Sequence, residues 1–484
     1  MSDLKATVQE TKDGFHIEGY EKIEYDFTFV DGIFDITNPN LADCYKKWGR
    51  VLAVTDKNVY GIYGSKMEKY FNHYKLRLKV HQTSIGEKAK TIDTFLEIAD
   101  SMNEFGIIRK EPVLVVGGGL VTDVAGFACA AYRRNTNFIR VPTTVIGLID
   151  ASVSIKVAVN YGRYKNRLGA YHAPLHTFLD FTFLRTLPIA QVRNGFAELI
   201  KISSCSHIQV FDLLDKFCEQ LIESKFGRAD GSRAEIRSAA DIVNREGIFE
   251  MLKLESPNLH EIGLDRVIAY GHTWSPMHEL IPETPLRHGH AIAIDMAYSA
   301  TLAKQRGLLS DKEHRRLFRL FSRAGLSIDH PQFDEEVLDK GTAAILKTRD
   351  GLLRLAVPNP LGSCTFLNGV SPQELKDALK RHKQIAKTYP RDGAGIEAYV
   401  DSSDTGYTDL ETENLSVEKA AKEAGVLGEG QSVANGLYDA YQQNGYSTGH
   451  FEVRDGGNDR TSQYSMDIPK NPVNGRPDGI QAQA

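Results

Sequence analysis

Residues 113–131 read VLVVGGGLVTDVAGFACAA, an apolar run of strand length that ends in three consecutive glycines and continues as a helix-like segment. Glycines between a strand and a helix let backbone N–H groups approach a phosphate, and the helix N-terminus adds a favourable dipole. The spacing differs from G-x-G-x-x-G, so the usual dinucleotide fingerprint is absent. The stretch predicts a strand–turn–helix unit and leaves two interpretations open: a loop for a nucleotide phosphate, or a tight turn without a ligand.

Strands and helices alternate around this stretch. Residues 50–55 (RVLAVT), 112–116 (PVLVV) and 139–141 have the length and composition of strands, whereas residues 91–105 place apolar side chains at helical spacing. Alternation of this kind predicts βαβ units and a parallel sheet, and therefore an α/β fold.

The pattern changes near Pro188. Amphipathic helical patterns follow, with few strand-like runs between them. From residue 389 the chain is rich in Gly, Asp, Ser, Asn and Gln, and too little apolar surface is available to offset chain ordering. We therefore expect an α/β domain over residues 1–188, an all-helical domain over 189–388 and a disordered polar tail over 389–484.

A hairpin is expected near the N-terminus. Residues 16–34 alternate polar and apolar side chains around Asp31-Gly32, a pair of residues that is typical of a tight turn. We assign this hairpin to the first domain.

Composition narrows the class of protein. In 484 residues, 58 basic and 63 acidic side chains give a net charge of −5, which argues against a nucleic-acid-binding surface. Glycines and Asp123 interrupt the most apolar region, no run approaches the roughly 20 apolar residues of a membrane span, and the N-terminus has no signal-peptide core. The five cysteines are scattered without CxxC spacing. We expect a cytoplasmic protein without nucleic-acid or membrane partners.

Polar side chains follow several of the predicted strands. Asp56 comes after residues 50–55, Thr143 and Thr144 come after residues 139–141, and the loop over residues 86–90 reads GEKAK. Each alone is typical of a turn or a helix cap. Together, at the strand ends of one sheet, they mark the usual ligand position of an open α/β fold.

The helical half contains one carboxylate and two histidines in suggestive contexts. Glu198 lies in AELIK, His272 in YGHTW and His288 in RHGH. A carboxylate with two imidazoles is a common ligand set for a catalytic Zn²⁺ that leaves a position open for substrate or water. Since no pair has HExxH spacing, the fold would have to bring the three together, and a structural role stays open for each histidine, with His278 and His290 as nearby decoys.

A basic cluster surrounds a predicted loop or hairpin. Lys156 precedes it, Lys165 and Arg167 follow, and Arg133-Arg134 lie upstream. Lys and Arg donate charge-assisted hydrogen bonds to phosphate. The cluster predicts a phosphate site, with a solvated basic face as the alternative.

These residues carry a resemblance to a known family. The runs VVGGGLVTDVAGFACAAYRR, VPTTVIGLIDASVSIKVAVNYGRYKN, RNGFAELIK, YGHTW and RHGHAIAIDM resemble the sugar phosphate cyclase superfamily, whose best-known member is 3-dehydroquinate synthase. The resemblance covers about residues 45–385. It implies an N-terminal Rossmann-like domain that binds NAD⁺, a C-terminal helical domain that binds one divalent metal ion (Zn²⁺ or Co²⁺), a sugar phosphate substrate and a homodimer.

The resemblance also assigns residues by position. The metal ligands would be Glu198, His272 and His288. The catalytic polar residues would be Lys201, Asp150, Lys156, Asn166 and Arg134, the last reaching the substrate phosphate of the partner subunit. The cofactor contacts would be Asp56, Asn58, Glu87, Lys90, Gly118, Gly119, Asp123, Thr143 and Thr144, with Lys165 as a neighbour in the active-site loop.

Several residues of this sequence differ from those of 3-dehydroquinate synthases at positions that bear on the choice of substrate. Pro276 stands where they carry a second histidine, Ala269 where they carry asparagine, and residues 347–351 (KTRDG) replace their lysine-rich stretch; Arg266 lies one residue from the place of their phosphate-binding arginine. A carboxylated seven-carbon substrate is therefore disfavoured, and the pattern resembles the branch that cyclises sedoheptulose 7-phosphate with loss of phosphate.

Two residues indicate a product within that branch. Ala269 with Thr348 resembles the enzymes that form desmethyl-4-deoxygadusol in mycosporine biosynthesis, whereas Asp and His at these positions would indicate 2-epi-5-epi-valiolone synthases. The expected activity is the former. The alternatives are a 2-epi-5-epi-valiolone synthase, then a 3-dehydroquinate synthase or an alcohol dehydrogenase of the glycerol dehydrogenase type.

Overall fold

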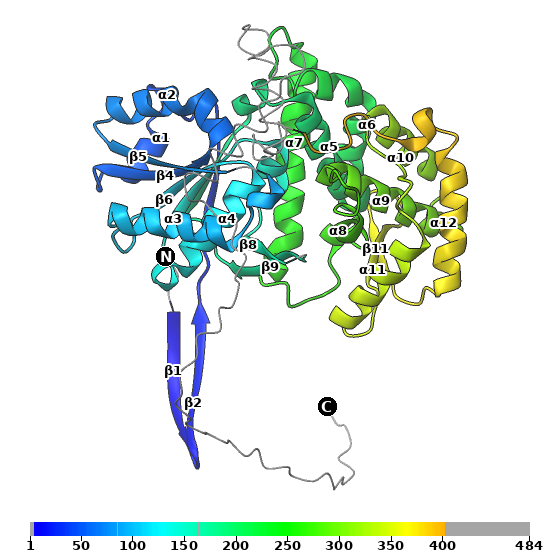
Figure 1. Cartoon of the computed structure of the whole chain (residues 1–484), viewed down its shortest axis with the longest axis horizontal. Coiled ribbons are helices and arrows are strands. Elements are labelled where there is room, and N and C mark those ends of the chain that lie inside the picture. Colours follow the sequence, from blue (N-terminus) through cyan, green and yellow to red (C-terminus); the bar gives the residue numbers. More distant parts are fainter. Residues whose placement is uncertain (1–3, 85, 163, 402–484) are drawn as a thin grey trace, which may run out of the picture. The chain divides into compact units, whose positions relative to one another are not determined.

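The computed structural model describes residues 4–84, 86–162 and 164–401 (Figure 1). Its strands are β1 (Leu4–Thr11), β2 (Gly14–Glu21), β3 (Asp26–Val30), β4 (Arg50–Asp56), β5 (Arg77–Thr83), β6 (Val113–Gly117), β7 (Phe138–Pro142), β8 (Lys156–Tyr161), β9 (Tyr164–Tyr171), β10 (His176–Asp180), β11 (Leu355–Pro358) and β12 (Cys364–Leu367). Its helices are α1 (Asn40–Tyr45), α2 (Lys57–His73), α3 (Ile92–Phe105), α4 (Gly119–Ala131), α5 (Ile189–Ser206), α6 (Ile208–Glu223), α7 (Ala234–Glu255), α8 (Ser275–His278), α9 (His288–Gln305), α10 (Asp311–Arg323), α11 (Glu335–Thr348) and α12 (Pro372–Ala386).

Among these residues, six strands form one parallel sheet in the order β3-β10-β7-β6-β4-β5. The chain runs outward from β4 through α2 to β5, then returns through α3 to β6 on the other side of β4. The strand order therefore reverses between β4 and β6, and in an open sheet ligands bind in the crevice outside the strand ends at such a point. The α/β prediction is confirmed.

The two faces of this sheet are covered by different helices. Within β4, Val51 and Ala53 pack in one apolar cluster with α1 and α2, whereas Leu52 and Val54 pack in another with α3 and α4. Because neighbouring side chains of a strand point to opposite faces, a strand that is buried on both sides must be apolar throughout, as RVLAVT is.

The N-terminal hairpin lies earlier in the chain than the alternation predicts. β1 and β2 pair antiparallel around residues 12–13, whereas β3, which precedes Asp31-Gly32, pairs parallel with β10 in the main sheet. The hairpin predicted over residues 16–34 is therefore wrong. Alternation shows that one face of a strand is polar, but it carries no information about the partner strand, and β3 at the sheet edge has the same pattern as a hairpin strand.

The second half of the chain is mainly helical, as expected. α9 is buried on every side, and α5 is buried over most of its length, which is the pattern of central core helices. Between α11 and α12 the chain adds the antiparallel pair β11-β12, which is too short to stand out from the helical pattern. Among the described residues, none of the helices combines the length and apolar character needed to cross a bilayer.

The disordered tail that was expected from residue 389 does not begin there, because the structure describes the chain up to residue 401. Residues 394–401, which we call the C-terminal strap, run along the helical half: the Ile396 N–H donates to the Gly325 carbonyl at 2.7 Å, and the Val400 N–H donates to the Pro285 carbonyl at 2.9 Å. Composition alone fails here because the strap is held mainly through its backbone. Residues 402–484 lie outside the described residues.

Candidate active site

The predicted cofactor residues gather at one edge of the sheet. Asp56 ends β4, Gly118 and Gly119 follow β6, and Thr143 and Thr144 follow β7. The loop after β5 contributes Glu87 and Lys90, the first turn of α2 contributes Asn58, and α4 contributes Asp123. Since β4, β5, β6 and β7 are parallel neighbours, their carboxyl ends all meet at this edge.

Neighbouring side chains lie so close to the backbone of Gly117 and Gly118 that a side chain at either position would clash with them. A Cβ on Gly118 would lie 3.0 Å from Cγ2 of Thr144, and a Cβ on Gly117 would lie 2.8 Å from Cβ of Val121. The Thr144 hydroxyl also accepts the Gly147 N–H at 3.0 Å. The turn leaves the N-terminus of α4 directed to the ligand edge, as an anion site requires.

Asp56 shows why a strand-end acid is ambiguous in a sequence. Its carboxylate caps α2 by accepting the Val59 N–H at 2.8 Å, which is the structural role that such a residue often has. Burial raises the pKa of Asp56, although the N–H groups of Val59 and Asn58 work in the opposite direction.

Two ion-paired lysines connect the cofactor edge to the β8-β9 hairpin. The Lys90 ammonium lies 2.6 Å from Oδ2 of Asp123 and 2.5 Å from Oδ1 of Asn166. The Lys165 ammonium lies 3.5 Å from Glu87. Burial opposes ionisation of Glu87, but the charges of Lys165 and Lys90 outweigh it and lower the pKa of this carboxyl.

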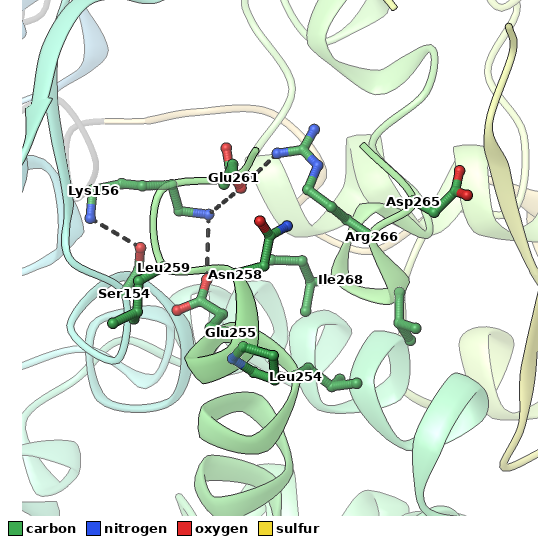
Figure 2. Close-up of a pocket in the computed structure, with 12 residues that line it drawn as sticks. Ser154, Lys156, Leu254, Glu255, Asn258, Leu259, Glu261, Asp265, Arg266 and Ile268 are labelled. Carbon is green, nitrogen blue, oxygen red and sulfur yellow. Dashed lines mark hydrogen bonds and ion pairs between the residues drawn. The ribbon is translucent and has the colours of Figure 1, made fainter. Parts of the chain in front are cut away.

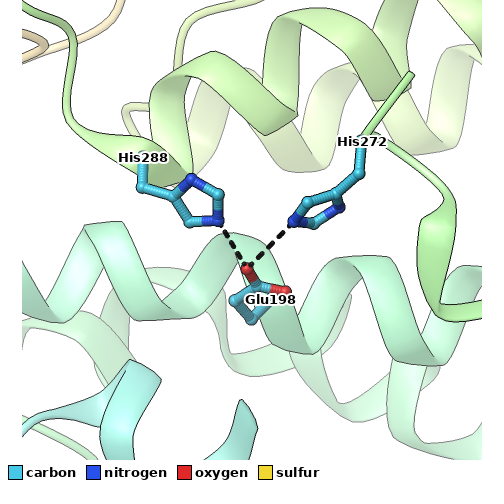
Figure 3. Close-up of side chains that lie close together, drawn as sticks. All are labelled: Glu198, His272 and His288. Atoms are coloured by element: carbon cyan, nitrogen blue, oxygen red, sulfur yellow. Dashed lines mark hydrogen bonds and ion pairs between the residues drawn. The ribbon is translucent and has the colours of Figure 1, made fainter. Parts of the chain in front are cut away.

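The predicted metal ligands come together in the helical half (Figure 3). Oε1 of Glu198 on α5 lies 3.1 Å from Nε2 of His288, the first residue of α9, and 3.9 Å from Nε2 of His272 before α8. One ligand atom from each of the three residues lies within 4.8 Å of the others. His278 and His290 stand outside this triad, and His290 hydrogen-bonds to Ser327 instead.

Helix α5 sets the spacing of this centre. Asn194, Glu198 and Lys201 share one helix face at i, i+4 and i+7. A Cβ on Gly289 of α9 would lie 2.2 Å from the carbonyl oxygen of Asn194, so only glycine lets the two helix backbones come close enough for Glu198 to reach His288.

Charge in the triad is tightly coupled. Burial and the neighbouring Lys201 lower the pKa of His272 to about 3, so its imidazole is neutral, as a metal ligand must be. Burial works against protonation of His288 as well, but Glu279 and Glu198 on either side raise its pKa to about 9. A cation that binds at Nε2 of His288 therefore replaces a proton.

Glu279 is a residue that the sequence patterns do not single out. Its Oε2 lies 3.1 Å from Nδ1 of His288, and its Oε1 lies 2.7 Å from the Lys165 ammonium. The carboxylate is buried, and although burial opposes ionisation, Lys165 and His288 hold its pKa far below the usual range. Glu279 thus orients a triad histidine and joins the triad to the cofactor edge. It belongs to no spacing motif, and only the fold reveals it.

Lys201 and Asp150 form a second link beside the triad. The buried Lys201 ammonium lies 2.9 Å from Oδ1 of Asp150 and 2.5 Å from Oε2 of Glu198. Burial lowers the proton affinity of Lys201, but Asp150 and Glu198 outweigh it and raise its pKa above the usual range. Lys201 is therefore a fixed cation beside Glu198, and its catalytic role stays a prediction.

Lys156 is one of the residues that line a cavity of about 210 Å³ (Figure 2). Its ammonium lies 3.1 Å from Glu261 and 3.3 Å from Glu255, and Glu261 also pairs with Arg266 at 2.5 Å. Burial opposes the charge of Lys156, but the two carboxylates raise its pKa. Sequence patterns did not single out Glu255 or Glu261. The lysines of the predicted basic cluster therefore have different partners: Lys156 pairs with Glu255 and Glu261, whereas Lys165 pairs with Glu87 and Glu279.

Arg134 is the predicted residue that a single chain does not bring to the site. It lies exposed after α4 with a positive φ of 68°, and among the described residues it forms no hydrogen bond or ion pair with the cluster. Of the two product-indicating residues, Ala269 is buried before the His272 loop, and Thr348 is exposed at the end of α11 with its hydroxyl bonded to the Ala344 carbonyl at 2.9 Å.

Family models match most of the residues that the structure describes. The model for the N-terminal part of 3-dehydroquinate synthase matches residues 80–194, and that for its C-terminal part matches residues 195–345. A demethyl-4-deoxygadusol synthase of Trichormus variabilis is 53% identical over 399 residues, which cover 82% of this chain and 97% of the relative. The chain belongs to the sugar phosphate cyclase superfamily.

Two further cyclases support the assignment. A 2-epi-5-epi-valiolone synthase of Actinomyces is 36% identical and covers 75% of this chain and 96% of its own length. A solved structure of 2-epi-5-epi-valiolone synthase from Streptomyces hygroscopicus subsp. jinggangensis, with NAD⁺ and Zn²⁺ bound, has 34% identity and a TM-score of 0.72 over 76% of this chain and 99% of that chain. This cyclase is therefore an enzyme, with the two-part fold of the superfamily.

Proposed function

We propose that this cyclase converts sedoheptulose 7-phosphate to desmethyl-4-deoxygadusol, a compound also called demethyl-4-deoxygadusol, with NAD⁺ and one divalent metal ion, Zn²⁺ or Co²⁺. The observation that carries the proposal is the contact chain from the triad to the cofactor edge: Glu198, His288, Glu279, Lys165 and Glu87 follow one another within 3.5 Å. Such a chain suits a reaction in which one substrate carbinol must face both a metal ion and a dinucleotide.

The side chains fit both groups. One carboxylate and two imidazoles are the hard and borderline donors that Zn²⁺ and Co²⁺ accept, and three protein ligands leave a position for a substrate oxygen. The close glycine turn and the strand-end acid suit a pyrophosphate and a ribose. When bound, NAD⁺ would supply a hydride acceptor and the metal ion a Lewis acid.

The chain's own residues have separate tasks. Lys201 orients the hydroxyl group of the carbinol whose carbon gives up hydride, and Asp150, which pairs with Lys201 at 2.9 Å, accepts and relays the proton of that hydroxyl. Lys156 and Asn166 hold the phosphate that leaves by β-elimination, and Glu255 and Glu261 keep the Lys156 ammonium charged until phosphate displaces them. We assign Arg134 to the phosphate of a second subunit, because it is exposed and forms no hydrogen bond or ion pair with the described residues of the cluster in its own chain; the enzyme would then be a homodimer.

The product assignment is supported by two kinds of observation. The relative that is 53% identical is named for demethyl-4-deoxygadusol, and Ala269 is a small buried residue three positions before His272. The second candidate product is 2-epi-5-epi-valiolone, since several relatives that are 34–37% identical carry that name. Repositioning of an intermediate by about 1 Å is enough to redirect chemistry.

A single incubation distinguishes the candidates. Purified protein is mixed with sedoheptulose 7-phosphate, NAD⁺ and either Zn²⁺ or Co²⁺, and the products are followed by phosphate release, mass spectrometry and ultraviolet absorption. We expect phosphate release without net NADH, and a product that has lost one more water than a valiolone. Accumulation of NADH without phosphate would indicate a dehydrogenase, and a valiolone mass would overturn the product assignment.

A matched pair of substitutions tests the product residues. The double variant Ala269→Asp/Thr348→His should shift the product toward the valiolone, whereas Ala269→Ser with the native Thr348 should retain the native product. An unchanged product profile in the double variant would show that these two positions do not control the outcome.

A further inference from the structure

The C-terminal strap, residues 394–401, contacts the segment that delivers a metal ligand. The Ala398 carbonyl accepts the Arg287 N–H at 2.8 Å, and Leu286 and Tyr399 form an antiparallel bridge. Arg287 directly precedes His288, and its carbonyl begins α9 by accepting the N–H groups of the next turn. The strap is therefore bonded to the backbone immediately before the ligand.

The Arg287 side chain strengthens this connection. Its guanidinium is only 1% exposed; it donates to the Glu397 carbonyl and lies 2.7 Å from Asp401. A buried cation is stable only where partners replace its hydration, and these partners belong to the strap. Displacement of the strap would leave the charge of Arg287 with fewer partners beside His288.

The segment before His288 is held from its other side as well. The Leu286 N–H donates to the Glu279 carbonyl at 3.0 Å, and the Glu279 carboxylate orients the His288 ring. Residues 285–287 thus lie between the strap and the residue that orients the ligand. The strap also reaches α5, since Glu397 pairs with Arg193 at 2.6 Å, five residues before Glu198 on the same helix.

We propose that the strap is a positioning element of the metal centre: it fixes the backbone at Arg287 and thereby sets the distance from His288 to Glu198. This inference rests on the proposed function only in that the triad binds a metal ion. Outer contacts that orient ligands are typically worth about 10- to 100-fold in metal affinity.

The test measures Co²⁺ binding by the full chain. Metal-free protein is titrated with Co²⁺ against a chromophoric chelator, the visible Co²⁺ absorption is recorded, and NAD⁺ affinity is measured on the same samples. Arg287→Gln removes the guanidinium contacts, and Arg287→Lys retains a charge. Gly395→Val displaces the strap directly, because a Cβ at Gly395 would lie 2.5 Å from Nδ1 of His290.

We expect Arg287→Gln and Gly395→Val to lower Co²⁺ affinity by about 10- to 100-fold and to change the Co²⁺ spectrum, with NAD⁺ affinity altered less than about two-fold. Arg287→Lys should recover part of the affinity. Glu397→Gln is the matched control: it removes the ion pair to Arg193 of a half-exposed carboxylate but keeps the carbonyl that Arg287 uses, so its effect should stay below about three-fold.

Several results would overturn the inference. Native Co²⁺ affinity and spectrum in Gly395→Val would show that the strap does not position the ligand, and an equal loss of Co²⁺ and NAD⁺ affinity would show a merely structural role. Should Arg287→Gln fail to fold, Gly395→Val tests the same link with the guanidinium in place. Absence of Co²⁺ binding by the unmodified chain would overturn the proposed function and the inference together.

Discussion

The cofactor edge and the metal triad are built in opposite ways. At the cofactor edge, neighbouring parallel strands each deliver polar residues within a few positions of the strand end, so sequence proximity to a strand predicts spatial proximity to the ligand. The triad draws Glu198 from α5, His272 from a loop and His288 from the start of α9, and its geometry depends on helix packing. The position of the cofactor edge follows from the order of the strands, whereas the geometry of the triad follows from the packing of the helical core.

The largest effect is expected from a substitution that disrupts the metal triad and leaves the cofactor edge intact. His272→Ala should reduce turnover by more than about 10³-fold, because two remaining ligands seldom hold a catalytic metal ion. Metal content, measured by plasma emission on dialysed protein, should fall accordingly, while NAD⁺ affinity stays close to native. The variant His260→Gln is the control and should retain metal, because His260 is exposed and lies outside the triad. Full turnover without metal would remove the assignment.

The converse experiment impairs the edge and spares the triad. Lys90→Met removes the ammonium that joins Asp123 and Asn166, and it leaves the Asp123 carboxylate without its cation beside an anionic cofactor. We expect NAD⁺ affinity to fall by about 10- to 100-fold, since a partly buried charge loses its partner at a cost of about 1–3 kcal/mol. Calorimetric titration with NAD⁺ and Co²⁺ separately would check this; an equal loss of Co²⁺ affinity would mean that the two sites are not separable.

Acid should act on the core of the helical half. Burial lowers the pKa of His314 to about 3 and that of His382 to about 4, against about 6.5 in an unfolded chain. Below pH 6.5 the unfolded chain therefore takes up protons that the folded chain does not. The stability that these neutral imidazoles contribute is complete above pH 6.5 and is lost as the pH falls through about 4.

The expected loss is about 2 kcal/mol for each histidine between pH 6.5 and 4.5. Urea unfolding at each pH, followed by Trp274 fluorescence in a Trp48→Phe background, reports on the helical half, since the chain has two tryptophans. His382→Gln should remove the share of one histidine, about 2 kcal/mol over this interval, and leave the contributions of the other buried histidines in place. A slope that is unchanged in this variant would assign the acid sensitivity to other groups.

The smallest expected effect comes from removing residues 402–484. The alignment with the relative that is 53% identical spans 399 residues and 97% of that relative, and the strap ends at residue 401. Turnover and Co²⁺ affinity of the chain ended after Asp401 should stay within about two-fold of the full chain. A large loss would show that the tail takes part in catalysis or in assembly.

Prediction from sequence succeeded where local pattern and geometry coincide. The parallel sheet, the glycine turn and the grouping of Glu198 with the two histidines all followed from short motifs, and the motifs were read together because they resemble one family. Residues that act through partners distant in the chain were not predictable in this way. Glu279, Glu255 and Glu261 each pair with a lysine about a hundred positions away in the chain, and Glu279 also holds the nearby His288.

Two errors have a related cause. The hairpin was assigned to residues 16–34 because alternation describes one strand and not its partner, and β3 finds that partner in β10, far along the chain. The disordered tail was predicted to start at residue 389 because the side chains beyond it are mostly polar. The strap is held mainly by backbone hydrogen bonds, which composition does not reveal.

Helix α5 has a consequence for divergence among enzymes of this plan. One face of this helix carries Asn194, Glu198 and Lys201. Asn194 accepts the Gly289 N–H of α9, Glu198 belongs to the triad and Lys201 pairs with Asp150, so the helix fixes the positions of these three residues relative to one another. Ala269 and Thr348 stand on other elements. A directed-evolution library that keeps residues 193–201 unchanged and randomises those two positions should yield enzymes with new products and little loss of stability. Helix α5 would then be the part that such enzymes share, and the residues around it the part that varies between them.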